Sequence, residues 1–197
     1  YYRSDYPEWV TRFNETRMRE IVADSDWIQA VPEAQRSLAR PDSAAYESDG
    51  IHTMFPHLAW LEADSTRPAR NAWALGAQPR ADRAVQLLAQ EAVKELDLGQ
   101  RGHVDYLGLS LSSTDYVGHA FGPYSQEQLE NLMHLDRQLG ELFAFLDREV
   151  GEGRWMAGLT ADHGVMTMPE DLVSSGEDPA ARRLDPAMVS AGLQSAV

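Results

Sequence analysis

The sequence predicts an α/β fold, built on parallel strands that helices cover. Two short apolar runs, 104–112 and 155–160, have the nearly continuous hydrophobic content of buried parallel strands. A long stretch of helical periodicity separates them, as the crossover helix of a β-α-β unit does. Each run is followed by a polar loop that contains aspartate and histidine. Because parallel strands bring the loops at their carboxyl ends to one edge of a sheet, we expect a functional site at that edge.

Two helices are expected to flank the first strand. From Pro79 onward apolar residues recur at helical spacing, and Gly99 supplies a natural stop. Ser125, with a glutamine three residues later, forms the capping box of the second helix. Its apolar residues continue for about seven turns, to the glycine at position 151. We therefore expect residues 79–170 to form a core α/β portion that carries the site.

The rest of the chain divides by composition into three further parts. Residues 1–23 carry an apolar face at helical spacing and are expected to be a helical segment of the core. Residues 24–78 contain four prolines and scattered aromatic side chains, which favours an irregular insertion or cap. Residues 171–197 are expected to continue a loop that covers Met168 to Gly176, followed by a short helix that begins at Asp185.

Composition excludes several classes of protein. Of the 197 residues 43% are hydrophobic, which is ordinary for a globular protein. Seventeen basic and 31 acidic residues give a net charge of -14, which argues against nucleic acid or an anionic membrane as partner. There is no cysteine, so disulfides and thiolate metal ligands are excluded. No apolar stretch approaches the roughly 20 residues of a membrane-spanning helix. The start at Tyr1, without a methionine, predicts an internal piece of a longer protein.

Four polar residues after the two apolar runs are candidate metal ligands. Asp115 and His119 stand four apart, so one helical turn would place both side chains on one side. Asp162 and His163 directly follow the second run. Carboxylate and imidazole are ligands suited to zinc. The alternative for the first pair is an aspartate that caps a turn beside a hydrogen-bonded histidine; the two pairs together favour a metal site.

The remaining histidines are not expected to bind metal. His52 and His57 lie five apart in the irregular stretch, but no carboxylate pattern accompanies them, and surface or hydrogen-bonded histidines are commoner. His103 is expected on the surface of a loop. His134 lies among leucines in the second helix, where packing or exposure is the commoner role.

Three motifs resemble those of the alkaline phosphatase superfamily. They are Ser112-Ser113-Thr114-Asp115-Tyr116-Val117-Gly118-His119, then Phe121-Gly122-Pro123, and then Thr160-Ala161-Asp162-His163-Gly164. They are similar above all to the type I phosphodiesterase/nucleotide pyrophosphatase-like branch and, within it, to the single-chain bacterial alkaline phosphatases. The resemblance extends from about Pro79 to Pro169, with a weaker match over Tyr1 to Asn14.

The resemblance implies a three-layer α/β/α sandwich, incomplete in this chain, with a two-zinc phosphotransfer site. Asp115 and His119 would bind one zinc ion, and Asp162 and His163 the other. The family completes the site with another histidine, another aspartate and a threonine or serine nucleophile, and none of these has a credible match here. The chain is therefore expected to hold four metal ligands and no catalytic nucleophile, which should lie upstream.

The function that follows from the resemblance is metal-dependent hydrolysis of phosphate monoesters through a covalent phospho-enzyme. Two alternatives stay open: a phosphodiesterase or nucleotide pyrophosphatase, and a non-catalytic fragment or binding module. The expected substrate is a small phosphate ester, and the isolated chain is expected to be inactive because the nucleophile is missing. By resemblance the protein would be periplasmic or secreted. The sequence leaves the oligomeric state open.

Overall fold

The computed structural model describes residues 5–23, 26–49, 52–58 and 75–195. It consists of two compact units, residues 1–163 and residues 164–197, which are described separately below. Four expected helical regions are confirmed, and the two expected strands are not.

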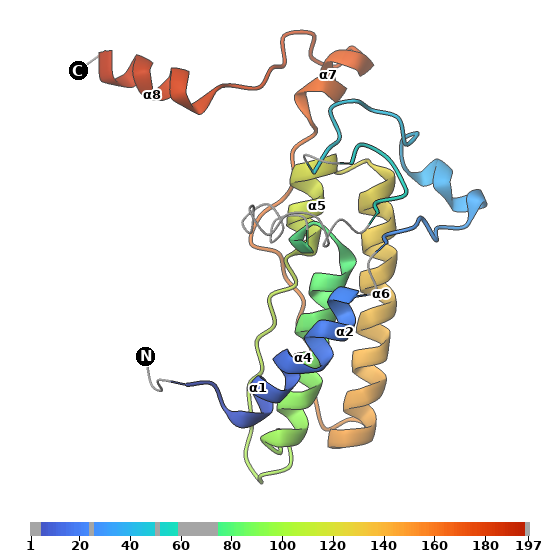
Figure 1. Ribbon diagram of the computed structural model, residues 1–197, viewed down its shortest axis with the longest axis vertical. Coiled ribbons are helices and arrows are strands. Elements are labelled where there is room, and N and C mark those ends of the chain that lie inside the picture. Colours follow the sequence, from blue (N-terminus) through green and yellow to red (C-terminus); the bar gives the residue numbers. More distant parts are fainter. Residues whose placement is uncertain (1–4, 24–25, 50–51, 59–74, 196–197) are drawn as a thin grey trace. The chain divides into compact units, whose positions relative to one another are not determined.

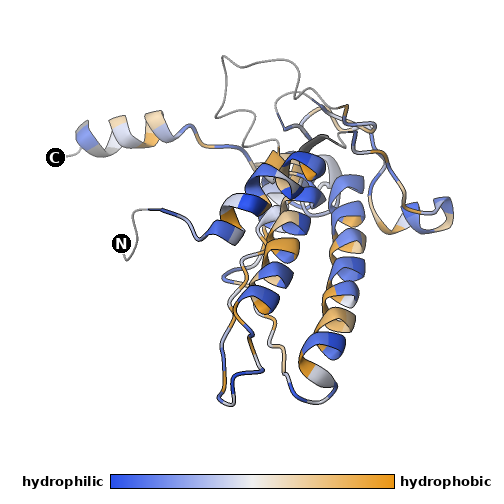
Figure 2. Ribbon diagram, turned by 60° about the horizontal axis from the view of Figure 1, so that its bottom comes forward, coloured by the Kyte–Doolittle hydropathy of each residue, from blue (hydrophilic) through white to orange (hydrophobic). Residues whose placement is uncertain are grey.

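Helices α4 (Pro79–Glu95), α5 (Ser113–Phe121) and α6 (Gln126–Leu146) form the framework of the first unit (Figure 1). Each of the three packs against the other two. Hydrophobic and hydrophilic residues share the surface of single helices, as amphipathic helices require (Figure 2). One apolar cluster joins α4 and α6 to the segments after them, and its buried members are Val93, Leu142, Phe145 and Val150.

The expected cap of the long helix is present. The Ser125 side chain accepts a hydrogen bond from the backbone N–H of Gln128 at 3.0 Å, which satisfies one of the free donors of the first turn. Helix α6 then continues into a π-helical turn, Asp147–Gly151, and ends at the glycine that the sequence indicated. Helix α4 begins at Pro79 as predicted and ends slightly before Gly99, whose φ of 76° is left-handed.

The N-terminal helical segment is confirmed, but as two helices. α1 (Glu8–Glu15) and α2 (Arg17–Ala23) meet at Thr16, and both pack on α4. The Thr16 side chain donates a hydrogen bond to the carbonyl of Arg12 at 2.7 Å, within the last turn of α1. A threonine that bonds locally in this way favours a helix end over a helix interior.

The region between α2 and α4 is irregular, as expected, over its described part. It contains one short 3₁₀ helix, η1 (Glu33–Leu38), and a single antiparallel bridge between Trp27 and His57. The backbone N–H of each of these two residues donates to the carbonyl of the other, at 2.8 and 2.9 Å. Trp27 also belongs to a second apolar cluster, whose other buried members are Ala77, Val117, Ala120 and Phe121. This cluster attaches the irregular region to α5.

The prediction of strands at 104–112 and 155–160 is wrong for this chain, since these residues form neither helix nor β-ladder. Their apolar side chains are largely exposed, with Val104 at 96%, Tyr106 at 93% and Met156 at 95% of full exposure. A strand exists only when neighbouring strands accept and donate its backbone hydrogen bonds. The described residues supply no such neighbours to these segments, so the apolar pattern is present without the sheet.

The second unit contains two helices. α8 (Pro186–Ser195) was expected, whereas α7 (Pro169–Ser175) lies where the sequence analysis expected a loop. The start and stop of α7 follow ordinary rules, because proline occupies its first turn and Gly176, with a φ of 78°, ends it in the left-handed conformation. The Arg183 guanidinium donates to the Glu170 carboxylate at 2.6 Å and lowers the pKa of that carboxyl group.

Candidate metal centre

Helix α5 positions the first predicted ligand pair. Its side chains divide sharply: Val117 and Phe121 are fully buried, while the side chains of Asp115 and His119 are 45% and 65% exposed. Asp115 and His119 are one turn apart, and Asp115 Oδ1 lies 3.4 Å from His119 Nε2. The helical turn that the spacing required is therefore present, and it presents a carboxylate and an imidazole on one exposed face.

The start of α5 is fastened to α4 by buried hydrogen bonds. The backbone N–H of Ser113 donates to Asp82 Oδ1 at 3.1 Å, and the Ser113 hydroxyl donates to the carbonyl of Gln78 at 2.9 Å. Burial raises the pKa of the Asp82 carboxyl group, and its hydrogen bonds from Ser113 and Ser112 only partly offset this. These contacts fix the turn that carries Asp115.

The second predicted pair lies beside the first. His163 Nε2 is 3.8 Å from Asp115 Oδ1 and 3.6 Å from Asp162 Oδ2. Asp162 also accepts a hydrogen bond from the backbone N–H of His163 at 3.1 Å. Asp115 therefore lies close to a histidine of each pair, His119 and His163. In the sequence, helix α6 separates the two pairs.

The donor set suits a divalent cation. Two carboxylates and two imidazoles offer the oxygen and nitrogen atoms that zinc prefers, and the side chains of His163 and Asp162 are 56% and 89% exposed, so their lone pairs are accessible. The contacts are pairwise, running from His119 to Asp115, from Asp115 to His163 and from His163 to Asp162. The assignment of these four residues as metal ligands stays a prediction.

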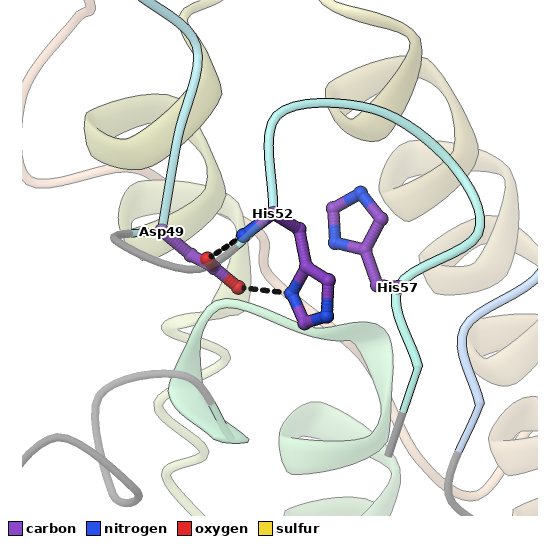
Figure 3. Close-up of side chains that lie close together, drawn as sticks. All are labelled: Asp49, His52 and His57. Atoms are coloured by element: carbon purple, nitrogen blue, oxygen red, sulfur yellow. Dashed lines mark hydrogen bonds and ion pairs between the residues drawn. The ribbon is translucent and has the colours of Figure 1, made fainter. Parts of the chain in front are cut away.

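A separate group of possible ligands lies in the irregular region (Figure 3). Asp49, His52 and His57 each offer one ligand atom, and these atoms all lie within 4.8 Å of one another. Asp49 accepts from the backbone N–H of His52 at 2.8 Å, and its other oxygen lies 2.9 Å from His52 Nδ1. No carboxylate pattern in the sequence accompanied the two histidines, but the structure places Asp49 beside His52 and Glu127 beside His57.

Burial distinguishes this group from the first. The side chains of His57 and Glu127 are completely buried, and His57 Nε2 lies 3.0 Å from Glu127 Oε1. Nearby, the buried carboxyl group of Glu47 binds the Arg40 guanidinium at 2.8 Å. Desolvation raises the pKa of Glu47 to about 7, with Arg40 acting against the shift and Glu127 adding to it.

The comparisons with known proteins identify the class of the chain. The family model for type I phosphodiesterase / nucleotide pyrophosphatase matches residues 6–192. The chain therefore belongs to this family of the alkaline phosphatase superfamily, in agreement with the resemblance of its motifs.

Within this family, the chain is similar to two bacterial alkaline phosphatases. Alkaline phosphatase PhoV of Synechococcus elongatus is 35% identical over 86% of this chain, and alkaline phosphatase PafA of Elizabethkingia meningoseptica is 29% identical over 83% of it. The crystal structure of wild-type PafA superimposes on 89% of the chain with a TM-score of 0.79 and 28% identity. The fold is therefore part of the PafA fold.

The match covers a limited part of these relatives. The chain spans 30% of the length of PhoV and of PafA, and 34% of the PafA chain in the crystal structure.

Among the described helices, none combines the length and the apolar character needed to cross a membrane.

Proposed function

We propose that this chain supplies part of the two-zinc site of a phosphoric ester hydrolase of the alkaline phosphatase type. The observation that supports the proposal most is the contact of the Asp115 carboxylate with both His119 and His163, because it joins the two predicted ligand pairs. In this proposal Asp115 and His119 bind one zinc ion, and Asp162 and His163 bind the other.

The residues of this chain would act by holding their donor atoms in place. Asp115 and His119 project from one turn of a helix whose other face is buried, so their spacing is set by the helix. His163 approaches Asp115 from the loop after 155–160, and Asp162 lies beside His163. Bound zinc would supply positive charge to the phosphoryl oxygens and lower the pKa of a hydroxyl group or water.

The proposed reaction is hydrolysis of phosphate monoesters through a covalent phospho-enzyme. The threonine or serine nucleophile and the remaining ligands would come from residues outside this chain, since its relatives are about three times as long. Residues outside this chain would also supply neighbouring strands. Residues 104–112 and 155–160 could pair with these strands in the sheet of a three-layer α/β/α sandwich. We further propose a small-molecule substrate and a periplasmic or extracellular location, by analogy with such phosphatases.

The alternative function is that of a phosphodiesterase or nucleotide pyrophosphatase. The description of the matching family favours it, because it names these two activities. The named relatives PhoV and PafA are alkaline phosphatases, and we rank the monoesterase first for that reason. A non-catalytic fragment or binding module is the third candidate, and it shares the fold and the ligands without the chemistry.

The test compares an aryl phosphate monoester with the matching diester, using zinc-loaded protein from the complete reading frame that contains this chain. We expect hydrolysis of the monoester to be preferred and to be lost in Asp162→Asn. The matched control is His103→Gln, because His103 is exposed and pairs with Asp105 away from the four ligands. Preference for the diester would support the alternative, and hydrolysis of neither ester would support the non-catalytic candidate.

A further inference from the structure

The buried face of α5 adjoins the second group of possible metal ligands, Asp49, His52 and His57. The His57 ring lies 5.0 Å from the ring of Phe121, and the backbone N–H of Ser48 donates to the carbonyl of Ala120 at 2.8 Å. Asp115 and His119 project from the exposed face of the same helix. Whatever binds at Asp49, His52 and His57 is thus separated from the proposed phosphoester site by the helix itself.

The contact with Glu127 occupies one ring nitrogen of His57 and leaves the other, Nδ1, open to a cation. A carboxylate accepts hydrogen bonds, so the proton of the contact with Glu127 lies on His57 Nε2. In the neutral ring Nδ1 then carries a lone pair. Nδ1 is buried and has no hydrogen-bond partner in the part of the chain that the structure describes. An imidazole held by a carboxylate on one nitrogen, with the other nitrogen open, is the usual arrangement of a metal-binding histidine.

The other two side chains, Asp49 and His52, complete the donor set. Asp49 and His52 are in contact, and the His52 ring stacks on the His57 ring with centroids 4.9 Å apart and planes inclined by 21° (Figure 3). Stacked rings do not point their lone pairs at one atom, so coordination by both requires one ring to turn. His52 is the less enclosed of the two rings, because its side chain is 12% exposed while that of His57 is completely buried.

The charges of the surroundings favour a cation. Asp49 and Glu127 are both buried carboxylates, and each lies beside one of the two histidines. Buried carboxylates are stable when a cation or hydrogen-bond donors compensate them. Two imidazoles and one carboxylate are a donor set that zinc accepts with one position left for water.

From these observations we propose that Asp49, His52 and His57 bind one zinc ion on the opposite side of α5 from Asp115 and His119. The ion would join the irregular region to the two helices that carry and support the phosphoester ligands, through His57 and its partner Glu127 on α6. This site is independent of the proposed hydrolase activity, because it shares no ligand with it.

The test follows the ring nitrogens of the six histidines by long-range ¹H–¹⁵N NMR while zinc alone is added to the full chain. We expect the His57 Nδ1 resonance to move on binding, in the wild type and equally in an Asp162→Asn, His163→Gln double variant. His52→Gln should weaken this zinc binding by about tenfold or more. His103→Gln, which alters an exposed histidine elsewhere, should leave it unchanged.

Two results would overturn the proposal: a His57 Nδ1 resonance that does not move at saturating zinc, or equal zinc affinity in His52→Gln and in the wild type. Circular dichroism of the metal-free proteins checks that His52→Gln retains the fold. If it does not, Asp49→Asn replaces it, because asparagine can still accept the hydrogen bond from the backbone N–H of His52 while the charged ligand is lost. The wild-type titration depends on neither variant.

Discussion

The Asp115 carboxylate lies 3.8 Å from the imidazole of His163, although helix α6 separates the two residues in the chain. Helices α5 and α6 pack against each other, and the segment that follows α6 brings His163 back to Asp115 on α5. Asp115 is consequently the member of the predicted ligand set that touches a histidine of each pair.

We predict that Asp115→Asn weakens zinc binding by the chain more than Asp162→Asn does. Asp115 contacts two histidines, whereas Asp162 contacts its neighbour His163 and is 89% exposed. Loss of the Asp115 charge should therefore weaken the binding of both zinc ions. Isothermal titration calorimetry with zinc measures the difference, and an equal effect of the two substitutions would contradict the prediction. Asp136→Asn, which removes an exposed carboxylate from α6, controls for net charge.

We predict that the isolated 197-residue chain hydrolyses no phosphate ester above background, even with added zinc. It holds the four proposed ligands, and the nucleophile that the family resemblance implies has no credible match in it. A sensitive chromogenic monoester provides the assay. Turnover that Asp162→Ala abolishes would show that the chain catalyses the reaction by itself, and the nucleophile would then have to be sought within it.

Ser125→Ala should destabilise the first unit by about 1 kcal/mol. The buried hydroxyl accepts from Gln128 N–H and donates to the carbonyl of Gly122 at 3.0 Å, and alanine can do neither. Urea unfolding followed by circular dichroism gives the change in the free energy of unfolding. Ser37→Ala, at an exposed position in η1, is the control and should have almost no effect. Equal midpoints for the two variants would argue against the cap.

Asp82→Asn should raise the urea midpoint at pH 7 and have less effect at pH 4. Burial raises the pKa of Asp82, so the folded state holds the proton more tightly than the unfolded state. The resulting stability is present below the unfolded pKa and is lost as pH rises through the folded pKa. Asparagine does not ionise, and it can still accept from Ser113 N–H. If Asp82→Asn instead had a lower urea midpoint than the wild type at pH 7, the folded state would favour the charged form of Asp82.

Local signals in the sequence were sufficient for most of the helices. The capping serine at 125, the proline at 79 and the apolar stripes between them act within a few residues, so α4 and α6 could be predicted with their ends. The short helix α7 was missed because its seven residues carry too few apolar positions to show a period, although its proline start and glycine stop were visible.

Features that depend on distant residues could not be predicted in the same way. The apolar runs at 104–112 and 155–160 indicate strands, but a strand needs partners that the described residues do not provide. His57 meets Glu127 from 70 residues away, and no local pattern marks that contact. Asp49, three residues before His52, was the one signal for the second ligand group that the sequence itself contained.

The division of α5 into a buried and an exposed face has a consequence for the affinity of an ion. Asp115 and His119 are held one turn apart by a helix whose other face is buried through its own Val117 and Phe121. The conformational entropy lost in bringing the two ligands together is therefore lost when the chain folds and not when an ion arrives. Such preorganisation strengthens binding. The same two side chains on a flexible loop would bind an ion less tightly, because the loop would have to be ordered at the moment of binding.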